Sequence, residues 1–262
     1  MIFRVGAATG DTHHDPRPIL IVTGLAQEAR IAEGPGLTVI CSSSDPTQLR
    51  AMLRSFDGSS VRGVISFGVA GGLDPKLRSG DVIVATSILA SAEASWSVET
   101  HLNPAILNGF DFGRRRVMRG ALVGVEQVVV GRAAKADLHA RTGAVAVDME
   151  SHIAAAFATE QNLPFAALRV VSDPASRSLP ALAVDALKPD GNVDLRKVIR
   201  GVARQPTVIK ELVSTGRDFN RALRGLRGCR ELLAVDAAGA TATSAKPSLP
   251  LPTLPPLAAG RT

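Results

Sequence analysis

The sequence predicts an α/β fold: a single domain with a mixed, twisted central β-sheet that is flanked by helices on both sides. From Arg17 onward, short runs rich in Val and Ile alternate with segments of helical periodicity. These runs are apolar on both faces, which is typical of strands that lie between two layers of helices. Apolar residues make up 45% of the chain and charged residues 21%, so wholesale disorder is excluded.

Each strand is predicted from an apolar, mostly β-branched run of the length of one core strand. In chain order these runs are Ile19–Thr23, Leu37–Cys41, Val61–Phe67, Asp81–Leu89, Val117–Val123, Ala144–Asp148 and Pro164–Ser172. The helices between and after them are predicted from helical patterns at Ala26–Ala32, Asp45–Phe56, Arg132–Arg141, Glu150–Gln161, Leu195–Val202 and Val208–Arg227. The last helix should pack one side against the core, because apolar residues recur at helical spacing at Val208, Leu212, Phe219, Leu223 and Leu226.

The chain divides into three parts. Residues 1–16 are expected to form a ragged leader, residues 17–233 the folded domain, and residues 234–262 a disordered tail rich in Pro and Ala. Whether the Leu-Pro alternation of the tail binds a partner or is only a spacer stays open. The leader lacks the apolar region of a secretory signal, and no apolar run reaches the roughly 18 residues of a transmembrane helix. A cytoplasmic protein is therefore expected.

The charge and the cysteines limit the classes of partner. The net charge is +6 and the pI is near 10.0, which is compatible with nucleic acid, an anionic membrane surface or a phosphorylated ligand. Aromatic residues are only 3%, without any Tyr, so we expect no nucleic-acid partner that depends on base stacking. Cys41 and Cys229 predict two reduced thiols rather than a disulfide, and they cannot form a metal site by themselves.

Three motifs lie at the ends of predicted strands, where open α/β sheets bind their ligands. The glycine-rich segment Ser66–Leu73 would let backbone N–H groups approach an oxygen-rich ligand, but it lacks the pattern of a Walker loop or a dinucleotide fingerprint. The segment Ala146–His152 carries two acids that could cap a helix or accept hydrogen bonds from a sugar diol. The segment Arg169–Ala175 carries an acid that is either a turn former before Pro174 or a functional group.

In this order, the motifs Gly-Val-Ala-Gly-Gly-Leu, Val-Asp-Met-Glu and Arg-Val-Val-Ser-Asp resemble those of the nucleoside phosphorylase/nucleosidase superfamily. The likeness is to its methylthioadenosine/S-adenosylhomocysteine nucleosidases and covers about Ile19 to Val213. The opening Thr-Gly-Leu-x-x-Glu-Ala-Arg-Ile-Ala and the basic C-terminal segment look most like the hopanoid-associated phosphorylases. The resemblance implies release of adenine from a 5′-modified adenosine, adenosylhopane, in hopanoid biosynthesis. The alternative is a soluble purine nucleoside such as methylthioadenosine or S-adenosylhomocysteine.

The resemblance also implies roles for individual residues. Asp173 would donate a proton to the leaving adenine, which requires burial to raise its pKa. Glu150 would bind the ribose hydroxyls, and Met149 would pack on the sugar. The residues implied at the purine are Val128, Val129 and Ser172, with Val128 standing where the family usually has an aromatic side chain.

The nucleophile stays open between water and inorganic phosphate, so the enzyme is either a nucleosidase or a phosphorylase. The implied loop beside the nucleophile consists of Gly68, Val69, Ala70 and Gly71. Glu28 is the candidate for activating water, although an ungapped match places Ala29 at that position. For phosphate, the arginine that bacterial phosphorylases place before the glycine loop is Ser66 here, and Arg30, or Ser43 and Ser44, could substitute. No metal and no cofactor other than phosphate are expected.

The basic C-terminal segment suggests contact with a membrane. Arg217, Arg221 and Arg224 share one side of the last predicted helix and could dock the enzyme on the inner face of the cytoplasmic membrane. The alternative is a solvated basic face. A homo-oligomer is implied by the resemblance.

Overall fold

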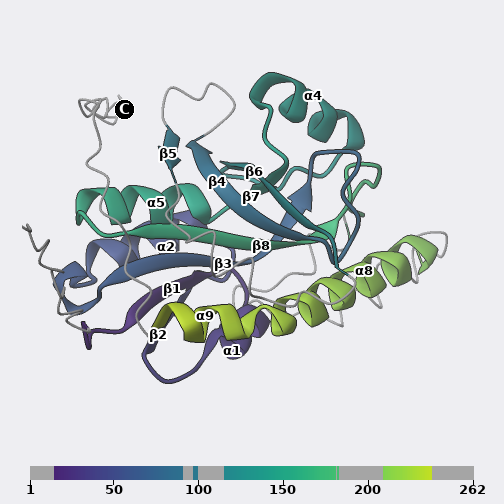
Figure 1. Ribbon diagram of the computed structural model, residues 1–262. Coiled ribbons are helices and arrows are strands. Elements are labelled where there is room, and N and C mark those ends of the chain that lie inside the picture. The colour runs from purple at the N-terminus through teal and green to yellow at the C-terminus, as the bar shows by residue number, and fades with distance from the viewer. Residues whose placement is uncertain (1–14, 91–96, 100–114, 181, 183–208, 238–262) are drawn as a thin grey trace, which may run out of the picture.

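Strands and helices alternate along the chain as predicted, within the residues that the computed structural model describes: 15–90, 97–99, 115–180, 182 and 209–237 (Figure 1). The strands are β1 (Ile19–Thr23), β2 (Leu37–Cys41), β3 (Gly63–Gly72), β4 (Val82–Ala90), β5 (Ser97–Glu99), β6 (Val117–Gly124), β7 (Ala146–Asp148) and β8 (Phe165–Asp173). The helices are α1 (Ala26–Ala32), α2 (Pro46–Arg54), the 3₁₀ turn η1 (Gly58–Ser60), α4 (Arg132–Thr142), α5 (Ser151–Glu160), α8 (Ile209–Gly228) and α9 (Arg230–Ala237).

The described strands form one mixed sheet of eight strands, with the order β2-β1-β3-β7-β6-β4-β5 and with β8 paired to both β3 and β4. The pairs β3–β7, β4–β5 and β4–β8 are antiparallel, and the other pairs are parallel. The pairings of β3, β7, β6, β4 and β8 follow one another in a closed ring, so this half of the sheet curls into a barrel. The predicted mixed α/β fold is confirmed.

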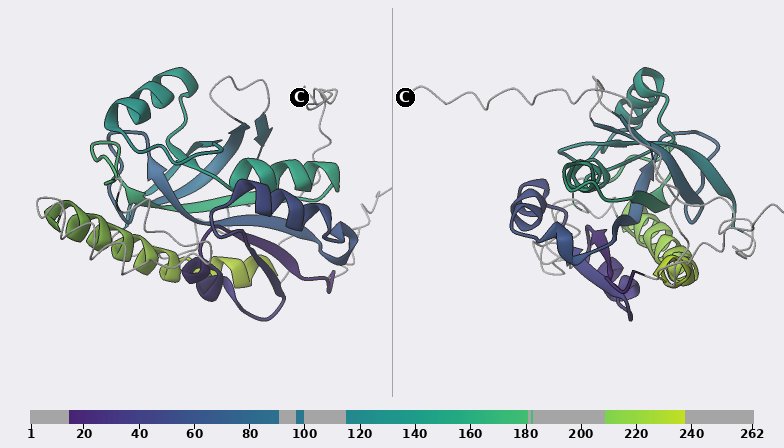
Figure 2. Two further views of the ribbon diagram at one scale, coloured as in Figure 1. Left: turned by 180° about the vertical axis from the view of Figure 1, so that it is seen from behind. Right: turned by 60° about the vertical axis from the view of Figure 1, so that its left-hand side comes forward.

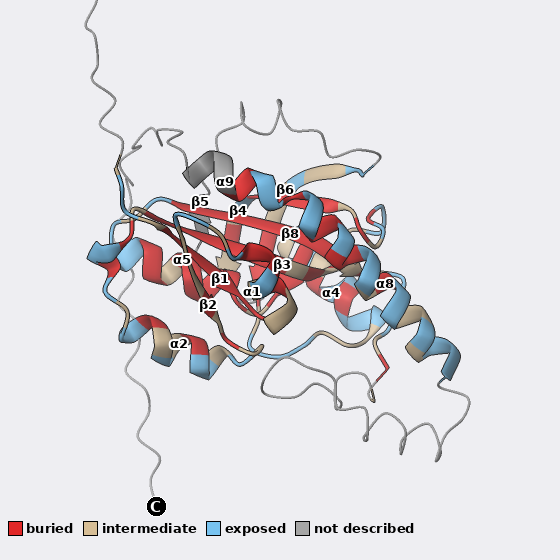
Figure 3. Cartoon of the chain, turned by 90° about the horizontal axis from the view of Figure 1, so that it is seen from below, coloured by how far each residue is buried: buried red, intermediate tan, exposed pale blue. Residues whose placement is uncertain are grey.

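Helices cover both faces of the sheet, so the central strands β1, β3 and β8 are buried on both sides. Along β1, Leu20 and Val22 join one apolar cluster while Ile19 and Ile21 join another. The first cluster includes side chains of α2 and α5, and the second includes side chains of α1, α8 and α9 (Figures 1 and 2). Figure 3 shows the result as buried strands beneath helices whose outer sides are exposed. This is the arrangement that apolar runs on both strand faces predict.

The glycine-rich segment is the main departure from the predicted elements. A loop was expected at Gly68, Val69, Ala70 and Gly71. β3 instead continues through Gly72, because along this stretch its backbone pairs with β8 on one side and with β7 on the other. Pairing on both sides outweighs the low strand propensity of glycine.

Three of the described elements were not predicted: the 3₁₀ turn η1, the strand β5 and the helix α9. β5 is only three residues long and is held by antiparallel pairing with β4, which leaves no periodicity to detect in the sequence. α9 ends at Ala237, beyond Ala234, where the tail was expected to begin. The rest of that tail, residues 1–14 of the leader and the predicted helix Leu195–Val202 lie outside the described residues.

Cys41 and Cys229 are both free thiols, as predicted. Within the described ranges, no helix combines the length and the apolar character that a membrane crossing requires.

Replacing Leu226 by Ala should lower the free energy of unfolding by about 2–5 kcal/mol, because this side chain is completely buried between α8 and the sheet. Denaturant unfolding measures the change. The neighbouring exposed Arg227→Ala is the control and should change stability by no more than about 0.5 kcal/mol. Equal effects of the two substitutions would contradict the packing of α8 on the sheet.

Candidate active site

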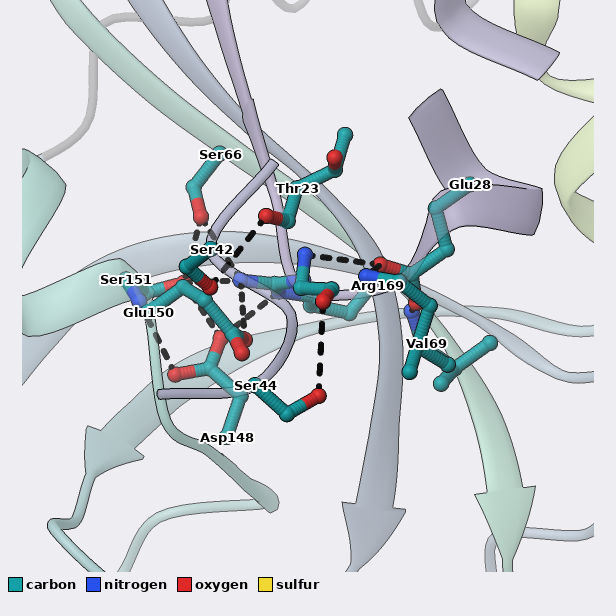
Figure 4. A network of polar contacts seen from close by, with 12 residues as sticks. Thr23, Glu28, Ser42, Ser44, Ser66, Val69, Asp148, Glu150, Ser151 and Arg169 are labelled. Atoms are coloured by element: carbon teal, nitrogen blue, oxygen red, sulfur yellow. Dashed lines mark hydrogen bonds and ion pairs between the residues drawn. The ribbon is translucent and has the colours of Figure 1, made fainter. Parts of the chain in front are cut away.

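A completely buried arginine, Arg169 of β8, organises the polar residues at the centre of the fold (Figure 4). Its Nε lies 2.6 Å from Asp148 Oδ2, and its Nη2 lies 3.4 Å from Glu150 Oε2. The same Nη2 donates hydrogen bonds to two buried hydroxyls, at 2.7 Å to Ser66 and 3.2 Å to Ser151. One guanidinium thus joins β3, β8 and the β7–α5 junction.

Glu28 is buried and its carboxylate is held entirely by backbone groups. Its Oε2 accepts hydrogen bonds from the N–H groups of Gly24 and Leu25, each at 2.9 Å, and its Oε1 accepts one from Val69 at 2.8 Å. Burial raises the pKa of Glu28, while Arg169 and the three N–H groups oppose that rise. Glu28 stands in the first turn of α1, so the carboxylate both caps this helix and ties it to β3.

Arg169 and Glu28 meet beside Gly68. A methyl group on Gly68 would collide with Nη1 of Arg169 and with the carboxylate of Glu28, so only glycine permits this approach. Nη1 of Arg169 is buried and has no hydrogen-bond partner among the described residues. A hydrogen-bond donor and a carboxylate therefore lie together next to the backbone of β3, which can orient a small polar molecule.

Glu150 lies on the other side of the same arginine. Its pKa is raised to about 8: burial contributes most to the rise, Arg169 opposes it, and the nearby carboxylates of Asp148 and Glu28 add to it. Its side chain does not cap α5; Asp148 does, accepting a 3.1 Å hydrogen bond from the N–H of Ser151. Of the two acids in this motif, Asp148 therefore caps the helix, and the carboxyl group of Glu150 is not used in capping.

Asp173 ends β8 and is also buried. The register places Ala70 opposite Val171 and Gly71 opposite Asp173, so Ser172 is the extra residue of a bulge that redirects the acid. Oδ1 lies 2.6 Å from the Ser172 hydroxyl, which is also 3.2 Å from the carbonyl of Ala70. Burial raises the pKa of Asp173, and Lys135, whose ammonium binds Oδ2, opposes this rise.

The predicted purine residues lie in the segment between β6 and α4. Val128 is exposed, whereas Val129 is half-buried and packs on the cluster around Leu73 and Leu138. This segment is anchored at Glu126, whose carboxylate binds Arg50 of α2 and lies 3.0 Å from Nε2 of the buried His152.

The residues predicted as alternatives for binding phosphate, Arg30, Ser43 and Ser44, lie outside the β6–α4 segment. Arg30 is exposed and stands two residues from Glu28 on α1, so it faces away from the Glu28 side of the helix. Ser43 and Ser44 both have positive φ angles, of 55° and 59°, and Ser44 donates its N–H to Gly24 at 2.7 Å. Their loop therefore closes over Gly24, whose Cα lies against the carboxylate of Glu150.

The sequence alone assigns no role to Arg169, Lys135 and Ser151. It leaves open whether Asp148 or Glu150 caps the helix, and it marks Ser66 only as the residue that replaces a phosphate-binding arginine. A signal existed for the arginine, because a charged residue in the apolar run of β8 needs a buried partner. None existed for Lys135, which stands in a helix of ordinary charged composition. Among the described residues, no group of three or more His, Cys, Asp or Glu side chains could hold a metal ion.

Comparison with known proteins identifies the family. Residues 12–204 match the model of the phosphorylase superfamily, so the chain belongs to this superfamily. This confirms the predicted superfamily, and with it an enzyme of the nucleosidase or phosphorylase class. No curated protein matches the sequence.

Solved structures show the same fold. The Helicobacter pylori 5′-methylthioadenosine/S-adenosylhomocysteine nucleosidase is 18% identical with a TM-score of 0.59, covering 84% of this chain and 97% of its own. Futalosine hydrolase of Helicobacter pylori is 17% identical with a TM-score of 0.59, covering 84% of this chain and 98% of its own. A nucleosidase from Colwellia psychrerythraea, solved with adenine, is 15% identical with a TM-score of 0.60, covering 86% and 96%.

Glu150→Gln should make the free energy of unfolding less dependent on pH. The folded protein holds a proton on Glu150 up to a pKa of about 8, whereas the ordinary value for the unfolded chain is 4.5. Stability from this group is therefore present below the unfolded pKa and is lost as the pH rises toward the folded pKa. Denaturant unfolding at about pH 5 and about pH 9 measures this, and the variant should lose less stability over the interval than the native protein.

Asp57→Asn is the control, because hydrogen bonds from Ser59 lower the pKa of Asp57 below its ordinary value of 3.8. Stability from Asp57 is lost only as the pH falls through values below 3.8, so this substitution should shift stability equally at both pH values. The same pH dependence in the native protein and in Glu150→Gln would contradict the assigned environment of Glu150.

Proposed function

We propose that the protein is a purine nucleosidase that hydrolyses the N-glycosidic bond of a 5′-modified adenosine. The observation that carries this proposal is the pair of buried polar centres along one strand: Arg169 with Glu28 and Glu150, and Asp173 with Lys135. Cleavage of this bond builds positive charge on the ribose and negative charge on the base. The acids around Arg169 can face the positive charge that develops on the ribose, and the raised pKa of Asp173 keeps a proton available for the base.

In this proposal Asp173 donates its proton to the leaving purine, and its raised pKa keeps that proton available. Glu150 binds the ribose hydroxyls, because its carboxylate is buried and is not used as a helix cap. Met149, half-buried beside it, packs on the sugar. The base is bordered by Val128 and Val129, with Ser172 fixing the orientation of the acid.

Water is the proposed nucleophile. Glu28 accepts a proton from it, and the unpaired Nη1 of Arg169 orients its oxygen. The charge balance favours water over phosphate, since Arg169 already faces three carboxylates, those of Asp148, Glu150 and Glu28. A phosphate anion would have to enter a buried site whose cation, Arg169, is already paired with Asp148 and Glu150, whereas water brings no charge.

The substrate that we propose is adenosylhopane, whose 5′ carbon carries a lipid. In addition to the sequence resemblance, the exposed large apolar side chains of the described residues are Val128, Ile209 and Val213. The segment after Asp173 links their two elements: Arg177 binds Ser214 of α8, and Leu179 donates its N–H to Val130 at 3.0 Å. Exposed apolar side chains on the two elements that this segment joins suit an apolar substituent.

An adenine-release assay tests the function. Adenosylhopane, methylthioadenosine and S-adenosylhomocysteine are each incubated with the purified protein, with and without inorganic phosphate. We expect adenine from adenosylhopane at a rate that does not depend on phosphate. Asp173→Asn should reduce turnover by roughly 10²–10⁴-fold, because an amide cannot protonate the base.

The controls of this assay separate the alternatives. A requirement for phosphate would show a phosphorylase, and faster cleavage of methylthioadenosine would show the soluble-nucleoside alternative. Native turnover in Asp173→Asn would remove this residue from the chemistry. Absence of adenine from all three substrates would overturn the proposed function.

We also propose that the exposed side of α8 contacts the membrane in which such a substrate resides. Its exposed cations are Lys210, Arg217, Arg221, Arg224 and Arg227. Arg221 is partly neutralised by an ion pair of 3.0 Å with Asp218, so the other cations dominate the charge of this surface.

The sequence resemblance further supports a homo-oligomer, which sedimentation velocity would resolve.

Liposome co-sedimentation tests the membrane contact. Binding should increase with the anionic lipid content and decrease with salt, because each basic residue near the surface contributes about 1 kcal/mol. Changing Arg217, Arg224 and Arg227 to Glu should abolish it. The matched control changes three exposed arginines elsewhere, Arg54, Arg78 and Arg132, to Glu and should bind more strongly than the α8 variant. Equal loss in both variants would indicate a response to net charge alone.

A further inference from the structure

Lys135 is a buried cation for which the proposed reaction has no direct use. It lies in the first turns of α4, and its side chain is completely buried. Burial disfavours an ammonium, and the positive end of a helix dipole disfavours it further. A charged lysine at this position therefore needs hydrogen-bond acceptors or an anion that offset the cost of burying its charge.

The ammonium has three hydrogens and three acceptors. It binds Oδ2 of Asp173, the carbonyl of Arg177 at 3.1 Å and the carbonyl of Pro174 at 3.3 Å. The lysine therefore fixes one oxygen of the acid and, with the same group, the turn that follows it. Since α4 begins directly after the segment that holds Val128 and Val129, this contact also sets the distance between the acid and the proposed purine slot.

The other carboxyl oxygen of Asp173, Oδ1, has a hydrogen-bond partner that suits both protonation states of the acid. Oδ1 faces the Ser172 hydroxyl, which has one proton and two acceptors within reach, Oδ1 itself and the carbonyl of Ala70. When Asp173 is protonated, the hydroxyl can accept from Oδ1 while it donates to Ala70; when Asp173 is charged, it can donate to Oδ1. The Oδ1 side is thus satisfied in both protonation states, while Oδ2 is held by Lys135.

We propose that Lys135 is a positioning residue for the proton donor: it holds Oδ2 of Asp173 so that Oδ1 carries and delivers the proton, and its charge stabilises the carboxylate that remains. The proposal rests on the proposed function. In the step, the Oδ1–H bond of Asp173 breaks and a bond forms between that proton and a nitrogen of the leaving purine. Lys135 keeps its three protons, and the resulting carboxylate is paired with its ammonium.

The charged groups around Asp173 define what the lysine contributes. Lys135 of α4 is the cation in direct contact, and Asp218 of α8 is the anion whose charge raises the pKa of Asp173. Asp218 is itself paired with Arg177 and Arg221, each at 3.0 Å. Removing the lysine charge should therefore raise the pKa of Asp173, because burial and Asp218 then act with less opposition.

The first experiment needs no turnover. The side-chain carboxyl of Asp173 is followed by ¹³C NMR as a function of pH, with the signal assigned by its loss in Asp173→Asn. In Lys135→Met the titration midpoint should move upward by about one pH unit or more. Lys135→Arg retains the charge and should stay near the native midpoint, and Lys76→Met, at an exposed lysine, should not move it. An unchanged midpoint in Lys135→Met overturns the proposal.

The second experiment uses the nucleoside that the native enzyme cleaves fastest. The alkaline limb of kcat/KM, which reports loss of the proton from the acid, should move upward in Lys135→Met, and the plateau should fall by about tenfold or more. A lower Tm with an unmoved limb would show a purely structural lysine. If Lys135→Met yields little folded protein, Lys135→Gln removes the charge and keeps a donor for the same measurements. Failure of the native enzyme to release adenine rejects the proposed function and leaves the NMR result to judge the lysine.

Discussion

The buried charge of Arg169 is the constraint on which the centre of the structure depends. A guanidinium in the middle of an apolar strand is tolerable only if anionic groups and hydrogen-bond acceptors surround it. Asp148 and Glu150 supply ion pairs from the β7–α5 junction, and the hydroxyls of Ser66 and Ser151 accept from Nη2. The direction of α5 and the closure of β7 on β3 follow from this requirement, because these elements carry the partners of the arginine.

The same constraint separates the acids into different roles. Asp148 pairs with Nε of Arg169 and caps α5, so it is structural. Burial raises the pKa of both Glu28 and Glu150, and the single positive charge of Arg169 opposes that rise. Asp173 lies beyond the bulge at Ser172 and has a cation of its own in Lys135. Arg169 of β8 and Lys135 of α4 therefore create two separate charged centres along β8, one around Glu28 and Glu150 and the other around Asp173.

The two charged centres lie close together because their side chains pack directly against the glycine backbone of β3. The glycine-rich end of β3 lies between the two centres, with Gly68 against Arg169 and Glu28 and with Gly71 against Asp173. Its N–H at Val69 also binds Glu28. The glycine-rich segment is therefore a paired strand whose lack of side chains lets charged groups approach the backbone. The motif suggests a loop in the sequence, but in the structure it lies within the sheet.

The sequence by itself determined the mixed α/β class and the bounds of β1, α1 and β2, because apolar runs and helical periodicity are local signals. It also singled out Glu28, Glu150 and Asp173 through their motifs. Tertiary structure alone decided that the glycine segment is a strand, that Asp148 rather than Glu150 caps α5, and that Lys135 reaches Asp173 across 38 positions of the chain. The physical reason is that strand pairing and the burial of charge depend on partners from distant segments, which no local pattern of residues contains.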